Sequence, residues 1–270
     1  IGTGLGVYSP GTAYVLLHHA MGDVDGNVGS WGFARGGMGA VAKAIASAFE
    51  SYGGDIRNDA EVKKIKVRGR KATGVTPASG EEIDARVVVS NLDAKRTYLG
   101  IMDRKDLPEE LIRRAENFKI RGSSGKVNIA LDGKPDFPAL ENGSPLTLGH
   151  MHFSDTLERL ERAYDDWKGG RWSARPYIDM LIPSQIDPTM APPGSHMMTV
   201  FVQYAPYDLA ADGQRSGQNW TDTARHALAE TVLDQISIAC PDIRERIQHM
   251  EVRSPLELET EVGLTEGNIF

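Results

Sequence analysis

The chain has 270 residues, of which 40% are hydrophobic and 25% are charged, and its formal net charge is −7. This length accommodates one large domain or two modest domains with a substantial core. The acidic balance disfavours a nucleic-acid-binding surface. No apolar run reaches the roughly 18–20 residues that a membrane-spanning helix requires, although peripheral contact with a membrane stays open.

The sequence carries few signals of cellular location. A secretory signal would open with a basic stretch and an apolar core, and the first residues show neither feature. Cys240 is the single cysteine, which excludes an internal disulfide and indicates a buried structural thiol. We therefore expect a cytoplasmic protein, with the mitochondrial matrix as the alternative in a eukaryote. The chain begins at Ile1 and ends in mid-pattern at Phe270, so we expect a piece of a longer protein.

The first third of the chain predicts two helices and a small sheet. A short helix is expected over 12–21, after Pro10. A longer helix is predicted from Gly39 to the Gly53-Gly54 pair, because apolar residues recur there at helical spacing. Period-two stretches at 62–67, 72–75 and 82–84 then predict an antiparallel meander.

Val87-Val88-Val89 follows the meander without polar alternation. Such a run is typical of a strand that is buried on both faces. The pattern therefore predicts that residues 87–89 lie inside a sheet.

The rest of the chain alternates helices and strands without a repeat. Helices are predicted at 93–102, 108–118, 156–167 and 221–239, and strands at 126–131, 177–182 and 197–204. The last of these strands is long and apolar, and we expect it at the centre of a second sheet. The fold class is therefore mixed α/β (α+β).

Glycine-rich segments at two places invite a nucleotide-binding interpretation. Gly2-Thr-Gly4-Leu-Gly6 lacks the preceding strand and following helix that a dinucleotide loop needs, so we reject it. Arg35-Gly36-Gly37-Met38-Gly39 opens the long helix, and glycines at such a position let a backbone or a flat ligand approach closely.

Together with Ser9-Pro10-Gly11, Asn58, Val62 and Val89-Ser90-Asn91, the segment 35–39 resembles the phytoene-desaturase-like branch of the FAD-dependent oxidoreductases. Ile182-Pro-Ser, Asp187-Pro-Thr-Met-Ala-Pro-Pro-Gly194 and Phe201-Val-Gln-Tyr-Ala-Pro-Tyr207 extend the resemblance along essentially the whole chain.

The resemblance implies FAD as the cofactor and a set of residues that contact it. It places Val62 at the adenine and Ser90-Asn91 beside the pyrophosphate. It places Gly36, Gly37 and Met38 near the isoalloxazine. The family's opening dinucleotide loop and its closing glycine-rich segment have no counterpart in this sequence. Binding of FAD is therefore expected of the whole protein and not of these 270 residues alone.

The substrate side carries weaker signals. His150 and His152 are two residues apart and fall on one face of a predicted strand. No third ligand lies nearby, so we expect pocket-lining or structural histidines and no metal. Phe201 and Tyr204 end the long apolar strand, where they either line a pocket or pack in the core.

These observations predict a fragment of a flavin-binding Rossmann-like domain, with a meander, joined to a substrate domain with a mixed or antiparallel sheet. Residues 36–94 are assigned to the FAD-binding part, 1–35 and 95–254 to the substrate domain, and 255–270 to a return toward the FAD part. The predicted function is transfer of a hydride from a small, apolar substrate to the flavin. The alternative is a non-catalytic scaffold or interaction protein with the same fold. No oligomeric state is implied.

Overall fold

A computed structural model describes residues 4–140, 144–154, 156–211, 214–215 and 220–269. The chain divides into two compact units, one formed by 1–42 and 121–270 and the other by 43–120. The second unit is thus inserted into the sequence of the first. The assignment of residues 36–94 to an FAD-binding part and of residues 95–254 to a substrate domain stays a prediction.

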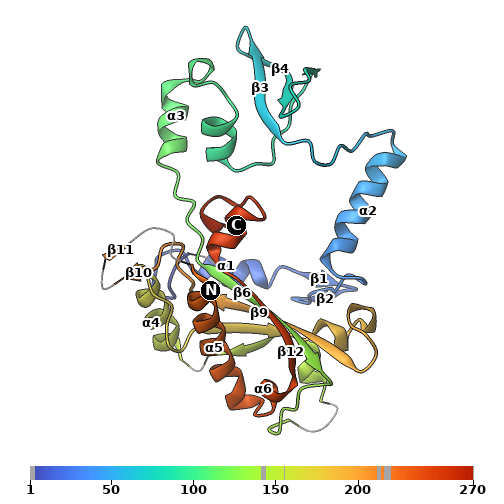
Figure 1. The fold of residues 1–270 in the computed structure, drawn as a ribbon, viewed down its shortest axis with the longest axis vertical. Coiled ribbons are helices and arrows are strands. Elements are labelled where there is room, and N and C mark those ends of the chain that lie inside the picture. The colour runs from blue at the N-terminus through green and yellow to red at the C-terminus, as the bar shows by residue number, and fades with distance from the viewer. Residues whose placement is uncertain (1–3, 141–143, 155, 212–213, 216–219, 270) are drawn as a thin grey trace. The chain divides into compact units, whose positions relative to one another are not determined.

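The first unit is built on a five-stranded antiparallel sheet with the order β12-β6-β9-β8-β7 (Figure 1). As predicted, the strand that contains 197–203 is central. The sheet strands are β6 (Ser124–Asp132), β7 (Met151–Phe153), β8 (Tyr177–Leu181), β9 (Ser195–Gln203) and β12 (Ile247–Arg253). The helices of this unit are α1 (Ala13–His19), α4 (Leu157–Lys168), α5 (Asp222–Ala239), α6 (Ile243–Arg246) and α7 (Pro255–Thr260). Two short hairpins, β1 (Asp23–Val24) with β2 (Asn27–Val28) and β10 (Ala210–Ala211) with β11 (Gln214–Arg215), complete it.

One face of the sheet forms the core. Val127, Ile129 and Leu131 alternate along β6 with more exposed residues and are at most 1% exposed. They pack with equivalent residues of β8 and β9 and with the apolar side of α5, including Leu228 and Ile236. Cys240 ends α5 in this core, and its burial raises the pKa of the thiol to about 12. The predicted buried structural cysteine is confirmed.

The second unit holds the predicted meander. Its strands are β3 (Val62–Arg68), β4 (Lys71–Pro77) and β5 (Ile83–Asp84), which pair in the order β3-β4-β5 and are antiparallel throughout. A π-helical turn (Arg96–Gly100) and α3 (Glu109–Glu116) follow, where two helices were predicted. Helix α2 (Met38–Ser51) spans the boundary between the two units.

Residues 87–89 do not form the predicted buried strand. They are described without strand pairing, and Val87 and Val89 are 74% and 88% exposed. Helix α2 shows the same departure, because none of its residues is buried and Ile45 is 66% exposed. Apolar periodicity indicates which face of an element is suited to burial, but burial also needs other residues to pack on that face. Among the described residues of this unit, none pack over residues 87–89 or over the apolar face of α2 in this way.

We expect Gly74→Ala to disrupt the second unit. Gly74 has φ +153°, and a Cβ there would lie 2.0 Å from the carbonyl oxygen of Ile83, so β5 would be displaced from β4. The expected cost is about 1–3 kcal/mol, as for other overpacked sites. Hydrogen exchange read by mass spectrometry should accelerate in peptides from 71–84. Gly100→Ala is the matched control, because its Cβ would meet nothing closer than 4.0 Å. Equal exchange in the two variants would contradict this account.

Candidate functional site

The face of the sheet opposite the core carries a row of side chains that includes predicted pocket residues. His152 on β7 pairs directly with Asp179 on β8, and Asp179 pairs with Phe201 on β9. Direct cross-strand partners project from the same face of a sheet. The three side chains therefore share one face, with the aspartate between the histidine and the phenylalanine.

His150 and Asp179 form a hydrogen-bonded pair beside this row. The imidazole Nδ1 lies 2.8 Å from Asp179 Oδ1, and this bond raises the pKa of His150 against the opposing effect of partial burial. The ring stacks on that of His152 at a centroid distance of 6.3 Å and an interplanar angle of 16°. The two imidazoles thus lie on one side of the strand, as predicted. The carboxylate fixes the ring of His150 through Nδ1, so Nε2 is left as the atom that can exchange a proton.

His152 is held by a different group. The hydroxyl oxygen of Tyr177 lies 2.6 Å from His152 Nδ1. Burial, and then the charge of Asp179, raise the pKa of Tyr177, so its phenol stays protonated beside Nδ1. This contact fixes the orientation of the His152 ring.

Both histidines line a cavity of about 400 Å³, here called the histidine cavity. Its other walls come largely from the N-terminal segment and are aromatic, and the lining residues are His19, Trp31, Phe33, Gly149, His150, His152 and Asp179. Trp31 stacks on His19 at 5.6 Å, and Phe33 stacks on His150 at 6.2 Å. The volume suits a small organic ligand, and mostly apolar walls with a few polar groups are typical of such sites.

The other two predicted pocket residues occupy different environments. Phe201 is half-buried on the open face. Tyr204 is 1% exposed, packs with Tyr164 and Trp167, and donates its hydroxyl hydrogen to the Leu5 carbonyl at 2.7 Å. These contacts are those of a core tyrosine, and a ligand-binding role for it stays a prediction.

Sequence reasoning missed five of the seven lining residues, among them Asp179, Trp31 and Phe33. Asp179 carried a signal, because an acidic residue interrupts the apolar strand Tyr-Ile-Asp-Met-Leu. Trp31 and Phe33 lie in a glycine-rich segment without periodicity, so nothing in the sequence joined them to His150. Within the described part of the chain, no three His, Cys, Asp or Glu side chains are grouped in a way that could hold a metal ion.

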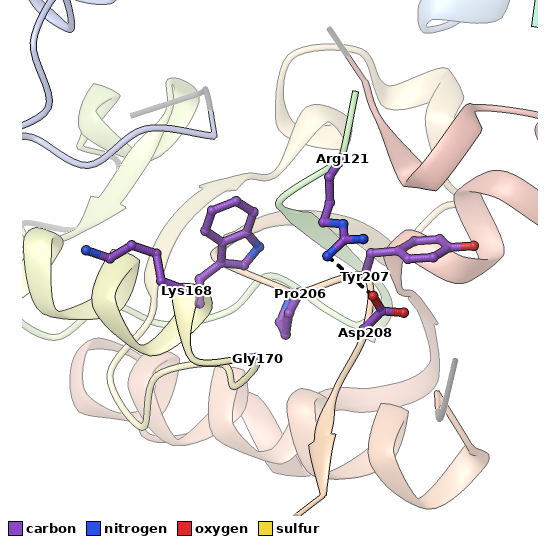
Figure 2. Close-up of a pocket in the computed structure, with 7 residues that line it drawn as sticks. Arg121, Lys168, Gly170, Pro206, Tyr207 and Asp208 are labelled. Atoms are coloured by element: carbon purple, nitrogen blue, oxygen red, sulfur yellow. Dashed lines mark ion pairs between the residues drawn. The ribbon is translucent and has the colours of Figure 1, made fainter. Parts of the chain in front are cut away.

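A second cavity lies between the end of α4 and the segment after β9 (Figure 2). Figure 2 shows Arg121 pointing toward Asp208, and the two charged groups are 3.4 Å apart. Arg121 also pairs with Glu266 at 3.0 Å. The cavity measures about 130 Å³, below the size of ordinary ligand sites. We therefore favour the histidine cavity over this smaller one as the functional site, and its histidine–aspartate pair supplies a group that can exchange a proton.

Gly36 and Gly37, which were predicted to lie near the flavin ring, have φ of +81° and +77°. Their conformation alone favours glycine, and a Cβ on Gly37 would lie 3.2 Å from Cε of Met190. Gly36 N–H donates to Asp187 Oδ2 at 2.6 Å, and this bond is the main reason for the lowered pKa of Asp187. Met38 follows at the start of α2 and is 77% exposed. The turn is thus held by the protein itself, and its small residues leave room for a flat group beside it.

The predicted adenosine contacts lie in the second unit. Val62 begins β3, while Ser90 and Asn91 are exposed in the segment after the meander. Ser90 Oγ lies 2.8 Å from Thr97 Oγ1. Backbone N–H groups of 86–92 make no backbone hydrogen bond within the described residues. These open polar groups fit a cofactor that is held through the main chain.

Comparison with known proteins identifies the family. The family model for flavin containing amine oxidoreductases matches residues 4–242. The chain belongs to this family. A flavin, FAD, is the cofactor that membership implies, and the described residues do not contradict it.

The matches with individual relatives cover most or all of this chain but less than half of each relative. Mouse pyridine nucleotide-disulfide oxidoreductase domain-containing protein 2 is 36% identical over 278 residues, which are 100% of this chain and 47% of the relative. The neurosporene-forming phytoene desaturase of Cereibacter sphaeroides is 30% identical over 83% of this chain and 40% of its own length. The chain thus spans about half the length of these relatives.

The structural comparison supports the fold. An oxidoreductase from Methanosarcina mazei superposes with a TM-score of 0.54 at 20% identity, over 82% of this chain and 43% of that structure. This similarity confirms the mixed α+β class that the sequence predicted. Among the described residues, no helix is both long and apolar enough to cross a membrane.

Proposed function

We propose that this chain forms the substrate-binding part of an FAD-dependent oxidoreductase that takes a hydride from an apolar substrate. The observation that carries the proposal is the flavin containing amine oxidoreductase match over 4–242. The histidine cavity adds a place for the substrate, with aromatic walls and one hydrogen-bonded histidine–aspartate pair.

The cofactor supplies the electron acceptor when it is bound, and the protein supplies binding, orientation and exclusion of water. We assign Gly36, Gly37 and Met38 to the ring side, and Val62 and Ser90-Asn91 to the adenosine and pyrophosphate side. Main-chain contacts at these positions need no particular side chain. This explains why no single residue among them carries a diagnostic sequence signal.

Oxidation of a carbon–carbon or carbon–nitrogen single bond releases a hydride and a proton. The proton requires an acceptor, and Nε2 of His150 is suited to this role because Asp179 holds Nδ1. The carboxylate stabilises the imidazolium that results, and it raises the pKa of His150 toward the range in which a base works at neutral pH. Thus His150 is assigned as the proton acceptor and Asp179 as its positioning residue.

The substrate is proposed to be apolar and planar in the part that enters the cavity. Trp31 and Phe33 present aromatic rings there, and offset stacking favours flat, conjugated groups. A relative of this chain is named for phytoene, which accords with this class. No residue of the cavity selects one conjugated compound over another.

The first test is flavin retention. A protein in which these residues are joined to the flanking segments that relatives carry should hold one FAD per chain, measured by visible absorbance. We expect Gly37→Ala to weaken FAD binding at least about ten-fold, because its φ of +77° and the contact with Met190 resist a Cβ. Gly39→Ala is the control, since no atom lies within 4 Å of the added Cβ.

Anaerobic bleaching of the bound flavin by conjugated, apolar compounds would then establish the reaction. A protein that folds but stays colourless with added FAD would refute the proposal and favour the non-catalytic scaffold. Retention of FAD without bleaching by any substrate class would refute the oxidation step while leaving the cofactor assignment in place.

A further inference from the structure

A third cavity, of about 440 Å³, lies beside the connection between β8 and β9. It shares no lining residue with the histidine cavity and has no part in the function proposed above. Its walls combine apolar residues, Leu148 and three prolines at 188, 192 and 193, with the polar residues Lys134, Gln185, Ser195 and His196. We call it the β8–β9 cavity.

Gln185 brings an unused donor to this cavity. Gln185 Oε1 lies 3.1 Å from Thr147 Oγ1, whose hydroxyl also lies 3.3 Å from the Ser144 carbonyl oxygen, and in this orientation the amide oxygen faces Thr147. The other end, Nε2, is buried and has no hydrogen-bond partner in the described part of the chain. A buried polar group without a partner costs about 1–3 kcal/mol, so a rotation of the Gln185 side chain that brings Nε2 to an acceptor on a ligand in the cavity would recover this energy.

His196 supplies a second polar group whose ring is oriented by its neighbours. Ser184 Oγ accepts from Met197 N–H at 3.1 Å and lies 2.9 Å from His196 Nδ1, so Nδ1 is engaged by Ser184 and Nε2 is the ring nitrogen left for a ligand. Burial, and then the charge of Lys134, lower the pKa of His196. The lowered pKa favours the neutral ring.

Lys134 gives the cavity a positive charge. Its ammonium makes no ion pair with any other described residue, and none of the residues that line the cavity is acidic. A cation, a neutral imidazole and an amide donor thus line one cavity with apolar walls. This combination is complementary to a carboxylate that is attached to an apolar body.

We propose that the β8–β9 cavity binds the carboxylate of a small apolar organic acid. The carboxylate oxygens accept hydrogen bonds from Gln185, His196 and Lys134. The apolar body lies against Leu148 and the prolines. A bound anion favours the protonated imidazole, so binding and protonation of His196 are coupled.

The test uses the 270-residue chain without flavin, with benzoate and inorganic phosphate as probes. Proton NMR follows the pH titration of the His196 ring, which His196→Gln assigns by loss of its signal. We expect benzoate to bind saturably and to raise the pKa of His196. Lys134→Met and Gln185→Leu should each weaken binding at least ten-fold, whereas Lys126→Met, at an exposed lysine outside the cavity, should not.

The alternatives give different results. An unchanged His196 titration at saturating benzoate would overturn the proposal, as would equal weakening by Lys134→Met and Lys126→Met. Tighter binding of phosphate than of benzoate would overturn the carboxylate assignment and identify an inorganic oxyanion site. Because no flavin is involved, each of these outcomes is independent of the proposed oxidoreductase activity.

Discussion

Replacing Ile236 by alanine is expected to destabilise the first unit by about 2–5 kcal/mol, because the side chain is fully buried between α5 and the sheet. The same substitution at Ile238, two residues along the same helix, should change stability by less than about 0.5 kcal/mol, since Ile238 is 75% exposed. The two variants share the same change in helix propensity. The difference between their free energies of unfolding therefore measures the contribution of burying the isoleucine side chain.

Tryptophan fluorescence in a urea titration is the appropriate measurement. All four tryptophans, at 31, 167, 172 and 220, lie in the first unit, so the signal does not report on residues 43–120. A shift in the urea midpoint with an unchanged slope identifies a change in stability. Similar midpoints for Ile236→Ala and Ile238→Ala would contradict the described core.

Asp179→Asn is expected to lower the pKa of His150, because the hydrogen bond to the carboxylate is the main cause of the raised value. Partial burial then acts unopposed and lowers the pKa further. Proton NMR of the His150 ring measures the change directly. Asp234→Asn, at an exposed aspartate on α5, is the control and should leave this titration unchanged.

The same variant tests the role of His150 in oxidation. We expect a loss in kcat/KM of about 10²-fold, the scale of positioned acid–base catalysis. The acidic limb of the pH profile should move to lower pH, because a base with a lower pKa remains unprotonated in more acidic solution. A merely structural role for Asp179 would lower activity without moving this limb, and that result would contradict the assignment.

The free energy of unfolding should also depend on pH through the His150–Asp179 pair. The folded-state pKa of His150 is raised above its unfolded value, so the pair stabilises the protein most below the unfolded pKa of about 6.5. This contribution is lost as pH rises through the folded-state pKa. The difference in unfolding free energy between the native protein and Asp179→Asn should therefore shrink toward alkaline pH.

The sequence predicted those elements whose pattern is set by local burial. Strands β6, β8 and β9 and helix α5 follow from alternation or helical periodicity, and the structure confirms them. The buried strand predicted at 87–89 is wrong. Its apolar side chains are suited to burial, but no described residues pack over them, and Val87 and Val89 are exposed. Strand β12 escaped prediction, since Ile247–Arg253 mixes polar and apolar residues at an edge of the sheet.

The site was less predictable than the fold. His150 and His152 were found by their spacing on one strand, yet the groups that set their chemistry, Asp179 and Tyr177, come from a strand about 25 residues further along the chain. Register between strands fixes such pairs, and register depends on the whole sheet. Trp31 joins the same cavity from more than a hundred residues away.

The insertion of residues 43–120 within the first unit bears on the order of folding during synthesis. The second unit is continuous in sequence, so its strands can pair as soon as it leaves the ribosome. The first unit must wait, because contacts such as Gly36 with Asp187 join segments on both sides of the insertion. Closing loops of that length is slow relative to local pairing. We therefore expect the N-terminal segment, with the aromatic wall of the histidine cavity, to become ordered only after β8 and β9 have been made.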